Sequence, residues 1–520
     1  MPAGNQLTTL IYAEVDAKTH DLEEAVTYLR SHLARMRSAP GFPVVVDSNV
    51  LLQCQRLDNV NWRQELKDEA RSSPASPHTA SEFLTQDTDV FCNNRKAMHL
   101  RLTTRCVGTI VVATALLGTS ATKTSATKSV PSPARLVTIK IPAPDGEIAS
   151  TWLRFLGYSK SLSYPGPPRA NVLLPAGYNP HKRYPLVIFL DGLGCNYASW
   201  AEGGLDKPFD HRGAIVVMPE GGDGWYTDWW NNGERGNPSW ESYYLETVIP
   251  TILARYPILP ERRYHALIGI SMGGLGATYL GGRLPGFFGS VASLSGFVDP
   301  QWNAAGIQEG MAGFSFARQN GDDDPYPIYG PPEGFYADGH NPTLLVKNLQ
   351  HTRVFVSTGT AVPSKADPNP GQEAIGSEHI IYPMSELYHK ALVAAGIHVT
   401  YQVHPGAHDV PDFLDEIRAM LKWDLFEPVV TDPASWTNKT VVTRGQLWDF
   451  NYRFTNPPTH VVQFKQSGTT LSISAAGSSV TITTANGCAI HTSTPATVHL
   501  PNRDLISPLF PDRVGHRACR

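Results

Sequence analysis

The chain has 520 residues, 41% hydrophobic and 17% charged, enough for two or three domains and at least one large core. The 43 Lys and Arg against 47 Asp and Glu give a formal net charge of −4, without the basic field of a nucleic-acid-binding protein. The six cysteines lack the spacing of metal ligands, so we expect no metal ion and no other cofactor.

The first 97 residues carry one weak similarity. An apolar stretch that begins at Phe42 predicts a buried strand and is followed by Asp47. Residues 44–62 resemble the opening of PIN-type nucleases, and this resemblance implies that Asp47 would be a metal ligand. Such a site needs further carboxylates along a complete α/β domain, but the chain becomes rich in Ser, Pro and Thr by Arg71. We therefore interpret residues 1–97 as a truncated, non-functional upstream segment.

Residues 98–121 have the order of a secretory signal peptide. Arg101 and Arg105 precede a run of twelve weakly to strongly apolar residues at 107–118, and small residues follow. We expect a true start at Met98 and a secreted or cell-envelope protein. A signal-anchor is an alternative, although twelve residues are fewer than the roughly 20 that span a bilayer, so we expect no stable membrane span. A buried core helix is the third interpretation.

Residues 122–133 have the composition of a flexible linker. From 134 to 426, strand-like runs alternate with helical patterns, which predicts an α/β fold with a mostly parallel sheet and helices on both faces. A helix is expected at 239–256 with Ser239 as its N-cap, and a last helix is capped by Asp409. The expected strands are 136–141, 151–158, 184–191, 214–219, 265–270, 288–295, 353–359 and 398–404.

The pattern changes after residue 426. Short β-rich segments separated by Gly, Asn and Pro predict a small accessory β-sandwich at 427–505, followed by a tail at 506–520. Its expected strands are 446–454, 460–466, 469–475, 479–484 and 496–500.

The sequence Gly-Ile-Ser-Met-Gly at 269–273 indicates a nucleophile. An apolar strand pattern precedes it and a helix rich in Gly, Ala and Leu follows, which is the context of a nucleophile elbow. Glycines at 269 and 273 let the neighbouring backbone approach, and the sharp turn exposes the Ser271 hydroxyl. A serine hydroxyl is a poor nucleophile at neutral pH, so a base and an orienting acid are required.

His408 is the expected base, because it lies in a loop between the last strand and the final helix. His404 falls within the strand and is interpreted as a surface or packing residue. The acid should follow the strand at 353–359, where Glu378 and Glu386 both qualify. Glu378 is expected at a helix start, where backbone amides and the helix dipole keep it ionised. Glu386 reads as a solvated residue inside that helix, and Asp367 and Glu373 in the preceding loop are weaker options.

The oxyanion hole needs two backbone N–H donors. We expect them at Met272, which follows the nucleophile, and at Leu193, in the turn after the strand at 184–191. Aromatic residues 225, 226, 229 and 230 cluster on a loop at the catalytic edge, where they either pack or support an acyl chain or sugar ring. The acidic triplet at 322–324 is interpreted as a solvated loop rather than a calcium site. The expected substrate-binding residues are Asp191, Trp225, Tyr226 and Trp229.

The order of these motifs resembles the secreted mycolyltransferase family, within the esterase D-like α/β-hydrolases. The likeness rests on Asp-Gly-Leu at 191–193, Trp-Tyr-Thr-Asp-Trp at 225–229, Trp-Glu at 240–241, the elbow, Leu-Ser-Gly-Phe-Val-Asp at 294–299 and Gly-Ala-His at 406–408. It covers about residues 134–426 and implies Ser271, Glu378 and His408 as the catalytic triad. The family has an aromatic residue ten positions after its acid, and Tyr388 stands there, which favours Glu378 over Glu386.

Two departures bear on the reaction. Mycolyltransferases have an arginine that helps to hold trehalose where this chain has Gly194, and they have a cysteine pair that is missing between Trp230 and Trp240. The turn ending at Cys195 is closer to that of cytosolic S-formylglutathione hydrolases, and we interpret Cys195 as a small wall residue.

The first hypothesis is therefore a secreted serine esterase acting on a small-molecule or lipid ester. The second is an acyltransferase of mycolyltransferase or diacylglycerol-acyltransferase type, which passes the acyl group to a sugar or glycerol hydroxyl. The third is a non-catalytic protein that binds a cell-envelope glycan or glycolipid.

Overall fold

The structure, a computed structural model, describes residues 132–142, 168–222, 224–230, 239–303, 326–501 and 517–518. The interpretations made for 1–121, for the strand at 151–158 and for the acidic triplet at 322–324 therefore lie outside the described residues. Within the described part, no helix combines the length and apolar character needed to cross a membrane.

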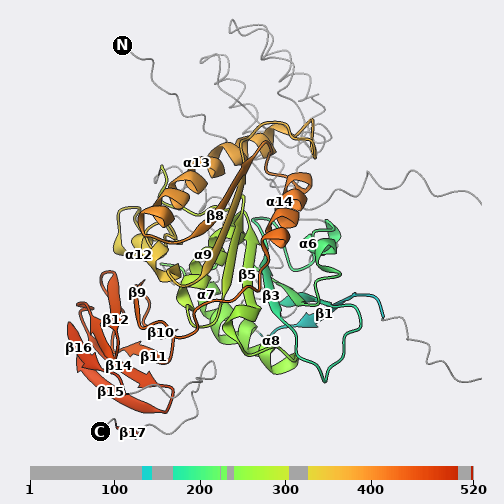
Figure 1. Cartoon of the computed structure of the whole chain (residues 1–520). Helices are drawn as coiled ribbons and strands as arrows, with labels where there is room; N and C mark the ends of the chain where they lie inside the picture. The colour runs from blue at the N-terminus through green and yellow to red at the C-terminus, as the bar shows by residue number, and fades with distance from the viewer. Residues whose placement is uncertain are drawn as a thin grey trace, which may run out of the picture. The chain divides into compact units, whose positions relative to one another are not determined.

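An eight-stranded sheet organises the first part of the fold (Figure 1). Its strand order is β1-β2-β4-β3-β5-β6-β7-β8, with β1 and β2 antiparallel to their neighbours and all later pairs parallel. The central strands are buried along their whole length, which explains their continuous apolar runs. The strands are β1 (Arg135–Lys140), β2 (Arg169–Leu174), β3 (Leu186–Leu190), β4 (Ile215–Pro219), β5 (His265–Ile270), β6 (Ser290–Leu294), β7 (Arg353–Gly359) and β8 (Val399–His404).

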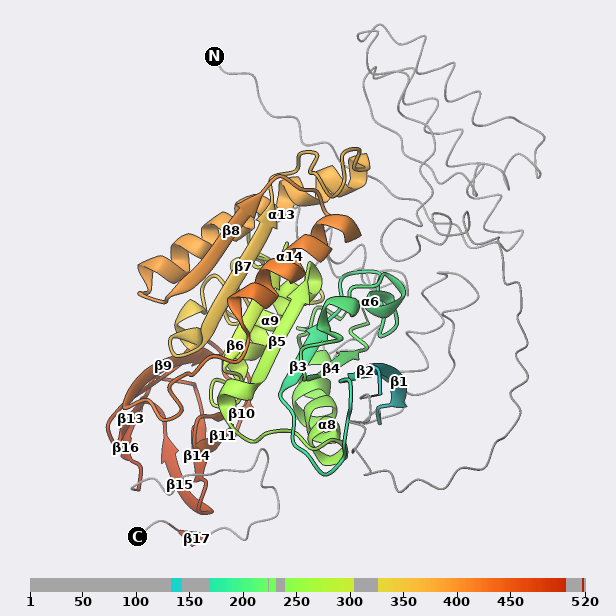
Figure 2. The same ribbon diagram turned by 45° about the vertical axis from the view of Figure 1, so that its right-hand side comes forward.

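Helices cover both faces of this sheet, as expected for an α/β-hydrolase. Helices α9 (Met272–Arg283) and α13 (Gln372–Ala394) lie on one face, and α6 (Ser199–Glu202) and α14 (Val410–Trp423) lie on the other (Figures 1 and 2). Asp409 caps α14 as expected, because its side chain accepts a hydrogen bond from the Asp412 N–H. The carboxyl ends of the parallel strands, and the helix that follows β5, therefore meet at one edge.

The helix expected at 239–256 is in fact three segments. They are α7 (Trp240–Tyr243), a π-helical turn at Tyr244–Val248 and α8 (Ile249–Arg255). Pro250 lacks an N–H and cannot continue the regular hydrogen-bond ladder, which accounts for the widened turn before it. Ser239 is the N-cap residue of α7, as expected, although its side chain makes no capping hydrogen bond.

Two sheets form a β-sandwich in the C-terminal part, and their strand pairs are antiparallel except for the parallel pair β15–β17. One has the order β10-β11-β14-β15-β17 and the other β16-β13-β12-β9. Inward side chains of both sheets share one core, in which the Tyr452 and Phe464 rings lie 4.9 Å apart. The strands are β9 (Ser435–Thr440), β10 (Arg444–Leu447), β11 (Phe450–Phe454), β12 (Val462–Ser467), β13 (Thr470–Ile473), β14 (Ser479–Thr484), β15 (Cys488–Ser493), β16 (Ala496–His499) and β17 (Arg517–Ala518).

Hydrogen bonds join this sandwich to the C-terminal end of α9. Arg283, the last residue of α9, donates from Nη1 to the Tyr452 hydroxyl at 3.2 Å and from Nη2 to the Arg444 carbonyl at 3.3 Å. Asn438 of β9 donates from Nδ2 to the carbonyl of Gly282 at 2.9 Å. The sandwich therefore supplies both a donor and acceptors to the last turn of the helix.

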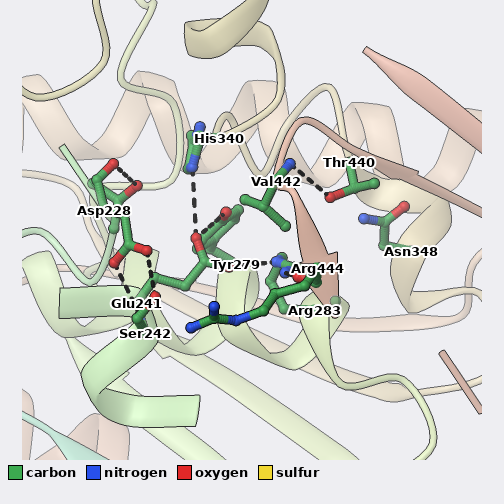
Figure 3. A network of polar contacts seen from close by, with 12 residues as sticks. Asp228, Glu241, Ser242, Tyr279, Arg283, His340, Asn348, Thr440, Val442 and Arg444 are labelled. Carbon is green, nitrogen blue, oxygen red and sulfur yellow. Dashed lines mark hydrogen bonds and ion pairs between the residues drawn. The ribbon is translucent and has the colours of Figure 1, made fainter. Parts of the chain in front are cut away.

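The same arginine forms a buried ion pair with Glu241 of α7 (Figure 3). Arg283 Nε lies 2.5 Å from Glu241 Oε1, and the Tyr279 hydroxyl donates to Glu241 Oε2 at 2.7 Å. Burial acts to raise the pKa of Glu241, but the charge of Arg283 and the neighbouring His340 lower it to about 2. Glu241 is therefore ionised at neutral pH, and the charge of Arg283 is compensated inside the protein.

Candidate active site

Ser271 lies in the sharp turn between β5 and α9. Its φ of 57° and ψ of −121° are rare for a residue with a side chain, and they are characteristic of a strained elbow. A Cβ added to Gly269 would lie 2.0 Å from the Gly273 carbonyl oxygen, so only glycine permits this approach. The sequence thus folds into the turn that projects a serine from the sheet edge.

Glu378 and His408 form a buried pair. His408 Nδ1 lies 2.8 Å from Glu378 Oε2, and both side chains are nearly inaccessible to solvent. The backbone N–H of His408 donates to the Ala374 carbonyl, and the imidazole packs edge-on against Phe413. Because an ionised carboxylate only accepts, Nδ1 carries the proton in this pair and Nε2 is the ring nitrogen left to accept one.

The other oxygen of Glu378 is also fully engaged. Oε1 accepts hydrogen bonds from the Ser295 hydroxyl, the Thr358 hydroxyl and the Gly359 N–H, each at 2.8 Å. Burial acts to raise the pKa of Glu378, but the bonds from His408, Thr358 and Ser295 outweigh it and hold this pKa below its usual value. The carboxyl is therefore ionised at neutral pH.

The position of Glu378 within its helix differs from the expectation. Helix α13 begins at Gln372, six residues before Glu378, so the helix start and its amides are not what holds this carboxylate. Side chains and an amide from β7 and from the turn after β6 do so instead. Glu386 lies further along α13, where it accepts a hydrogen bond from Tyr401 at 2.8 Å and is 3.7 Å from Lys390.

Backbone bonds bring the serine turn and the acid to the same edge of the sheet. The Ser271 N–H donates to the Leu294 carbonyl, and the Ser271 carbonyl accepts from the Phe297 N–H. Between these two contacts, Ser295 reaches Glu378 with its hydroxyl. The segment 294–297 thus binds both the backbone of Ser271 and the side chain of Glu378, the acid that binds His408.

The turn expected to supply an oxyanion donor lies against the serine. A Cβ added to Gly192 would lie 3.5 Å from the Ser271 Cβ, and the turn is closed by a hydrogen bond from the Cys195 N–H to the Gly192 carbonyl. Leu193 occupies this turn and is half-buried. Met272 is the first residue of α9, where a backbone N–H has no acceptor within its own helix. Cys195 is buried and disulfide-bonded.

The four expected substrate-binding residues are held by contacts inside the protein. The Tyr226 hydroxyl donates to Asp191 Oδ1 at 2.5 Å, and the Gly221 N–H donates to Asp191 Oδ2 at 3.2 Å. Trp229 Nε1 donates to the Gly224 carbonyl, and Trp225 packs on Phe297 at 5.2 Å between ring centroids. All four side chains are buried, whereas Trp230, the remaining aromatic residue of this cluster, is 41% exposed.

The sequence did not single out the residues behind Glu378. Ser295 lies within the Leu-Ser-Gly-Phe-Val-Asp motif and Thr358 within a predicted strand, and neither pattern indicates a contact with the acid. Glu416 of α14 was not considered, although it is buried and its Oε1 lies 2.9 Å from His404 Nε2. No spacing rule marks these residues, because β6, β7, β8 and α14 bring them together only in the folded chain. Within the described ranges, no group of three or more His, Cys, Asp or Glu side chains is suited to hold a metal ion.

Residues 161–423 match the family model Esterase, described as "Putative esterase". Esterase MT1326 of Mycobacterium tuberculosis (strain CDC 1551 / Oshkosh) is 28% identical over 267 residues, which are 49% of this chain and 56% of that protein. The MPT51/MPB51 antigen of Mycobacterium bovis is 30% identical over 216 residues, which are 39% of this chain and 67% of the antigen.

A third relative is the diacylglycerol acyltransferase/mycolyltransferase Ag85C of Mycobacterium leprae, 28% identical over 34% of this chain and 55% of that protein. The chain thus spans little more than half the length of the esterase and acyltransferase relatives that it matches. The family model itself covers half of the chain, in the segment that contains the elbow, Glu378 and His408. The protein accordingly belongs to the esterase family of α/β-hydrolases.

Proposed function

We propose that the chain is a serine carboxylic-ester hydrolase with Ser271 as nucleophile, His408 as general base and Glu378 as the acid that orients the base. The observation that carries this proposal is the buried 2.8 Å contact between His408 Nδ1 and Glu378 Oε2 at the sheet edge where the strained Ser271 turn lies. An imidazole held in this tautomer can accept the serine proton at Nε2.

The reaction follows from these atoms. Ser271 Oγ attacks the ester carbonyl carbon while its proton passes to His408 Nε2, and the N–H groups of Met272 and Leu193 stabilise the oxyanion. Collapse of the tetrahedral intermediate breaks the bond to the alcohol, which leaves with the proton from His408. Water then attacks the acyl-enzyme, gives a proton to His408 and releases the carboxylic acid, with the proton returning to Ser271.

We further infer that water is the usual acceptor. Position 194, where the resembling mycolyltransferases have a trehalose-holding arginine, is a glycine with a φ of 72°. This residue cannot provide a charged contact to a sugar. Transfer to a trehalose or glycerol hydroxyl remains the alternative, because a relative of this chain is named as an acyltransferase and both reactions share the acyl-enzyme.

The test uses p-nitrophenyl esters of several acyl lengths with the full chain. Ser271→Ala should lower kcat at least about a thousand-fold. Ser472→Ala, at an exposed position of the β-sandwich, serves as the matched control and should leave kcat unchanged. Equal activity in wild type and Ser271→Ala contradicts the proposal. Trehalose and diacylglycerol are added in parallel, and a new acylated product would identify transfer.

We also propose that the protein is secreted or held in the cell envelope, with a cell-envelope glycan or glycolipid as its partner. The signal-like pattern at 98–121 supports this location. Sequencing the N-terminus of the exported protein tests it, because a mature chain that retains residue 50 contradicts processing.

A further inference from the structure

A second buried carboxylate lies behind the proposed catalytic acid. Glu416 of α14 is 1% exposed, and its Oε1 lies 3.1 Å from Ser295 Oγ and 2.9 Å from His404 Nε2. Ser295 Oγ is also 2.8 Å from Glu378 Oε1. One serine hydroxyl therefore stands between two acid–histidine pairs, His408 with Glu378 and His404 with Glu416.

The number of protons shared by Ser295, His404 and Glu416 determines which carboxylate Ser295 can bind. A hydroxyl has one proton, so Ser295 can donate to only one carboxylate at a time. His404 Nδ1 faces the Pro405 carbonyl at 2.9 Å and must donate to it, because a carbonyl only accepts. One further proton lies between His404 Nε2 and Glu416 Oε1, and either atom can carry it. With this proton the pair is neutral, and without it Glu416 is an uncompensated anion beside Ser295.

Several charged groups face this pair. Glu378 of α13 acts on Glu416, Asp412 of α14 acts on His404, and His408, in the loop between β8 and α14, is paired with Glu378. Burial raises the pKa of Glu416, and the charge of Glu378 raises it further. Burial acts to lower the pKa of His404, but the hydrogen bond and charge of Glu416 raise it to about 9. Because the pKa values of His404 and Glu416 are both raised, the proton between them is retained at neutral pH.

We propose that Ser295 and Glu416, together with His404, are positioning residues for the catalytic acid. The neutral His404–Glu416 pair leaves the Ser295 hydroxyl free to donate to Glu378, and this donation fixes the carboxylate that orients His408. The proposal rests on the proposed function, since it assigns a role relative to the same triad. It adds a second acid–histidine pair that does not touch the substrate.

Two substitutions should move the pH profile in opposite directions. Ser295→Ala removes a donor from Glu378, so the carboxylate becomes more basic and stabilises the imidazolium of His408 more strongly. The acidic limb of kcat/KM should move up by about 0.3–1 pH unit, with kcat lowered several-fold and KM within about two-fold. Glu416→Gln removes the anion that compensates a protonated His404, so at acidic pH the neutral pair becomes a net cation near His408 and the limb should move down by a similar amount.

Matched controls lie next to each site. Ser293→Ala removes a buried hydroxyl two residues away on β6, which has no hydrogen-bond partner in the described structure. Asp415→Asn removes an exposed charge from the same helix as Glu416. Neither should move the limb. A merely structural role for Ser295 or Glu416 would lower the amount of folded enzyme without changing the profile, and that outcome would overturn the proposal.

A measurement independent of activity separates this proposal from the proposed function. The His404 ring signal, assigned with His404→Gln in ¹³C-histidine-labelled protein, should titrate near pH 9 in wild type and at a clearly lower pH in Glu416→Gln. An unchanged His404 midpoint contradicts the pairing even if the esterase is active. A wild-type chain that hydrolyses no ester contradicts the proposed function, and the NMR titration still decides whether the pair exists.

Discussion

Replacing Arg283 by methionine should destabilise the protein strongly while sparing catalysis. The Arg283 and Glu241 side chains are each only 3% exposed, and they lie 2.5 Å apart. Removing one partner of a buried ion pair leaves the other charge uncompensated, at a cost of about 3–5 kcal/mol in the free energy of unfolding. Arg283 also donates to Tyr452 and to the Arg444 carbonyl, so contacts to the sandwich are lost in the same step.

The size of the loss should depend on pH. The pKa of Glu241 is lowered to about 2 in the folded wild type, so its stabilising contribution is present above the ordinary value near 4.5. That contribution disappears as the pH falls through about 2. Without Arg283 the burial of Glu241 dominates and raises its pKa, so the variant should instead lose stability as the pH rises above 4.5.

Urea unfolding followed by tryptophan fluorescence measures these differences. Adding Glu241→Gln to Arg283→Met removes the uncompensated charge and should recover at least about 1 kcal/mol. Arg418→Met, which breaks an exposed pair with Asp415, is the control and should change stability by no more than about 0.5 kcal/mol. The twelve residues of α9 separate Arg283 from Ser271 by about 18 Å, so kcat of the folded variant should stay within about two-fold. A loss below 1 kcal/mol, or no recovery in the double variant, would refute the reasoning.

Three further substitutions test the elbow, helix α13 and the N-cap of helix α14. Gly269→Ala puts a methyl group 2.0 Å from the Gly273 carbonyl oxygen, and it should cost about 1–3 kcal/mol and lower kcat, as measured by urea unfolding and ester hydrolysis. Gly376→Ala within α13, where a Cβ meets no atom within 4 Å, should be neutral or stabilising. Burial, with Asp367 and Asp412 nearby, raises the pKa of Asp409 to about 7, so the folded state retains this proton while the unfolded chain loses it near 4. Wild type should therefore lose stability relative to Asp409→Asn between about pH 4 and 7, and parallel pH profiles of the melting temperature would contradict this.

The strands of the main sheet were the easiest part to predict, because buried parallel strands are continuous apolar runs. Seven expected strands correspond to β1 and β3–β8, but β2 was missed. Strands β9 and β15 in the sandwich were also missed, and so was β17, which lies in the segment expected to be a tail. β9 buries only alternate positions and reads Ser-Trp-Thr-Asn-Lys-Thr, a polar sequence in which Trp436 is the single large apolar side chain. Such a strand depends on its partners more than on its own pattern.

The surroundings of the candidate site were harder to predict than its principal residues. Chain order and motif spacing pointed to Glu378, yet the reason given for its ionisation was wrong because α13 starts earlier than the Gly-rich, polar sequence suggested. The hydrogen bonds that hold its charge come from Ser295, Thr358 and Gly359, on two other strand ends. Such contacts between distant segments leave no local signal. The aromatic residues at 225–229 did give a local signal, but their composition could not distinguish a binding platform from buried packing.

The contacts at the end of α9 also constrain how this architecture could change by recombination. Asn438 donates a hydrogen bond to the Gly282 carbonyl, and the Tyr452 hydroxyl accepts one from Arg283, so the helix that starts at the nucleophile ends on side chains of the sandwich. Exchanging residues 427–505 for an unrelated module would expose a carbonyl group and an arginine that water must then solvate. Hydrolase and sandwich are therefore expected to be inherited as one unit, with substitutions at Gly282, Arg283, Asn438 and Tyr452 occurring together.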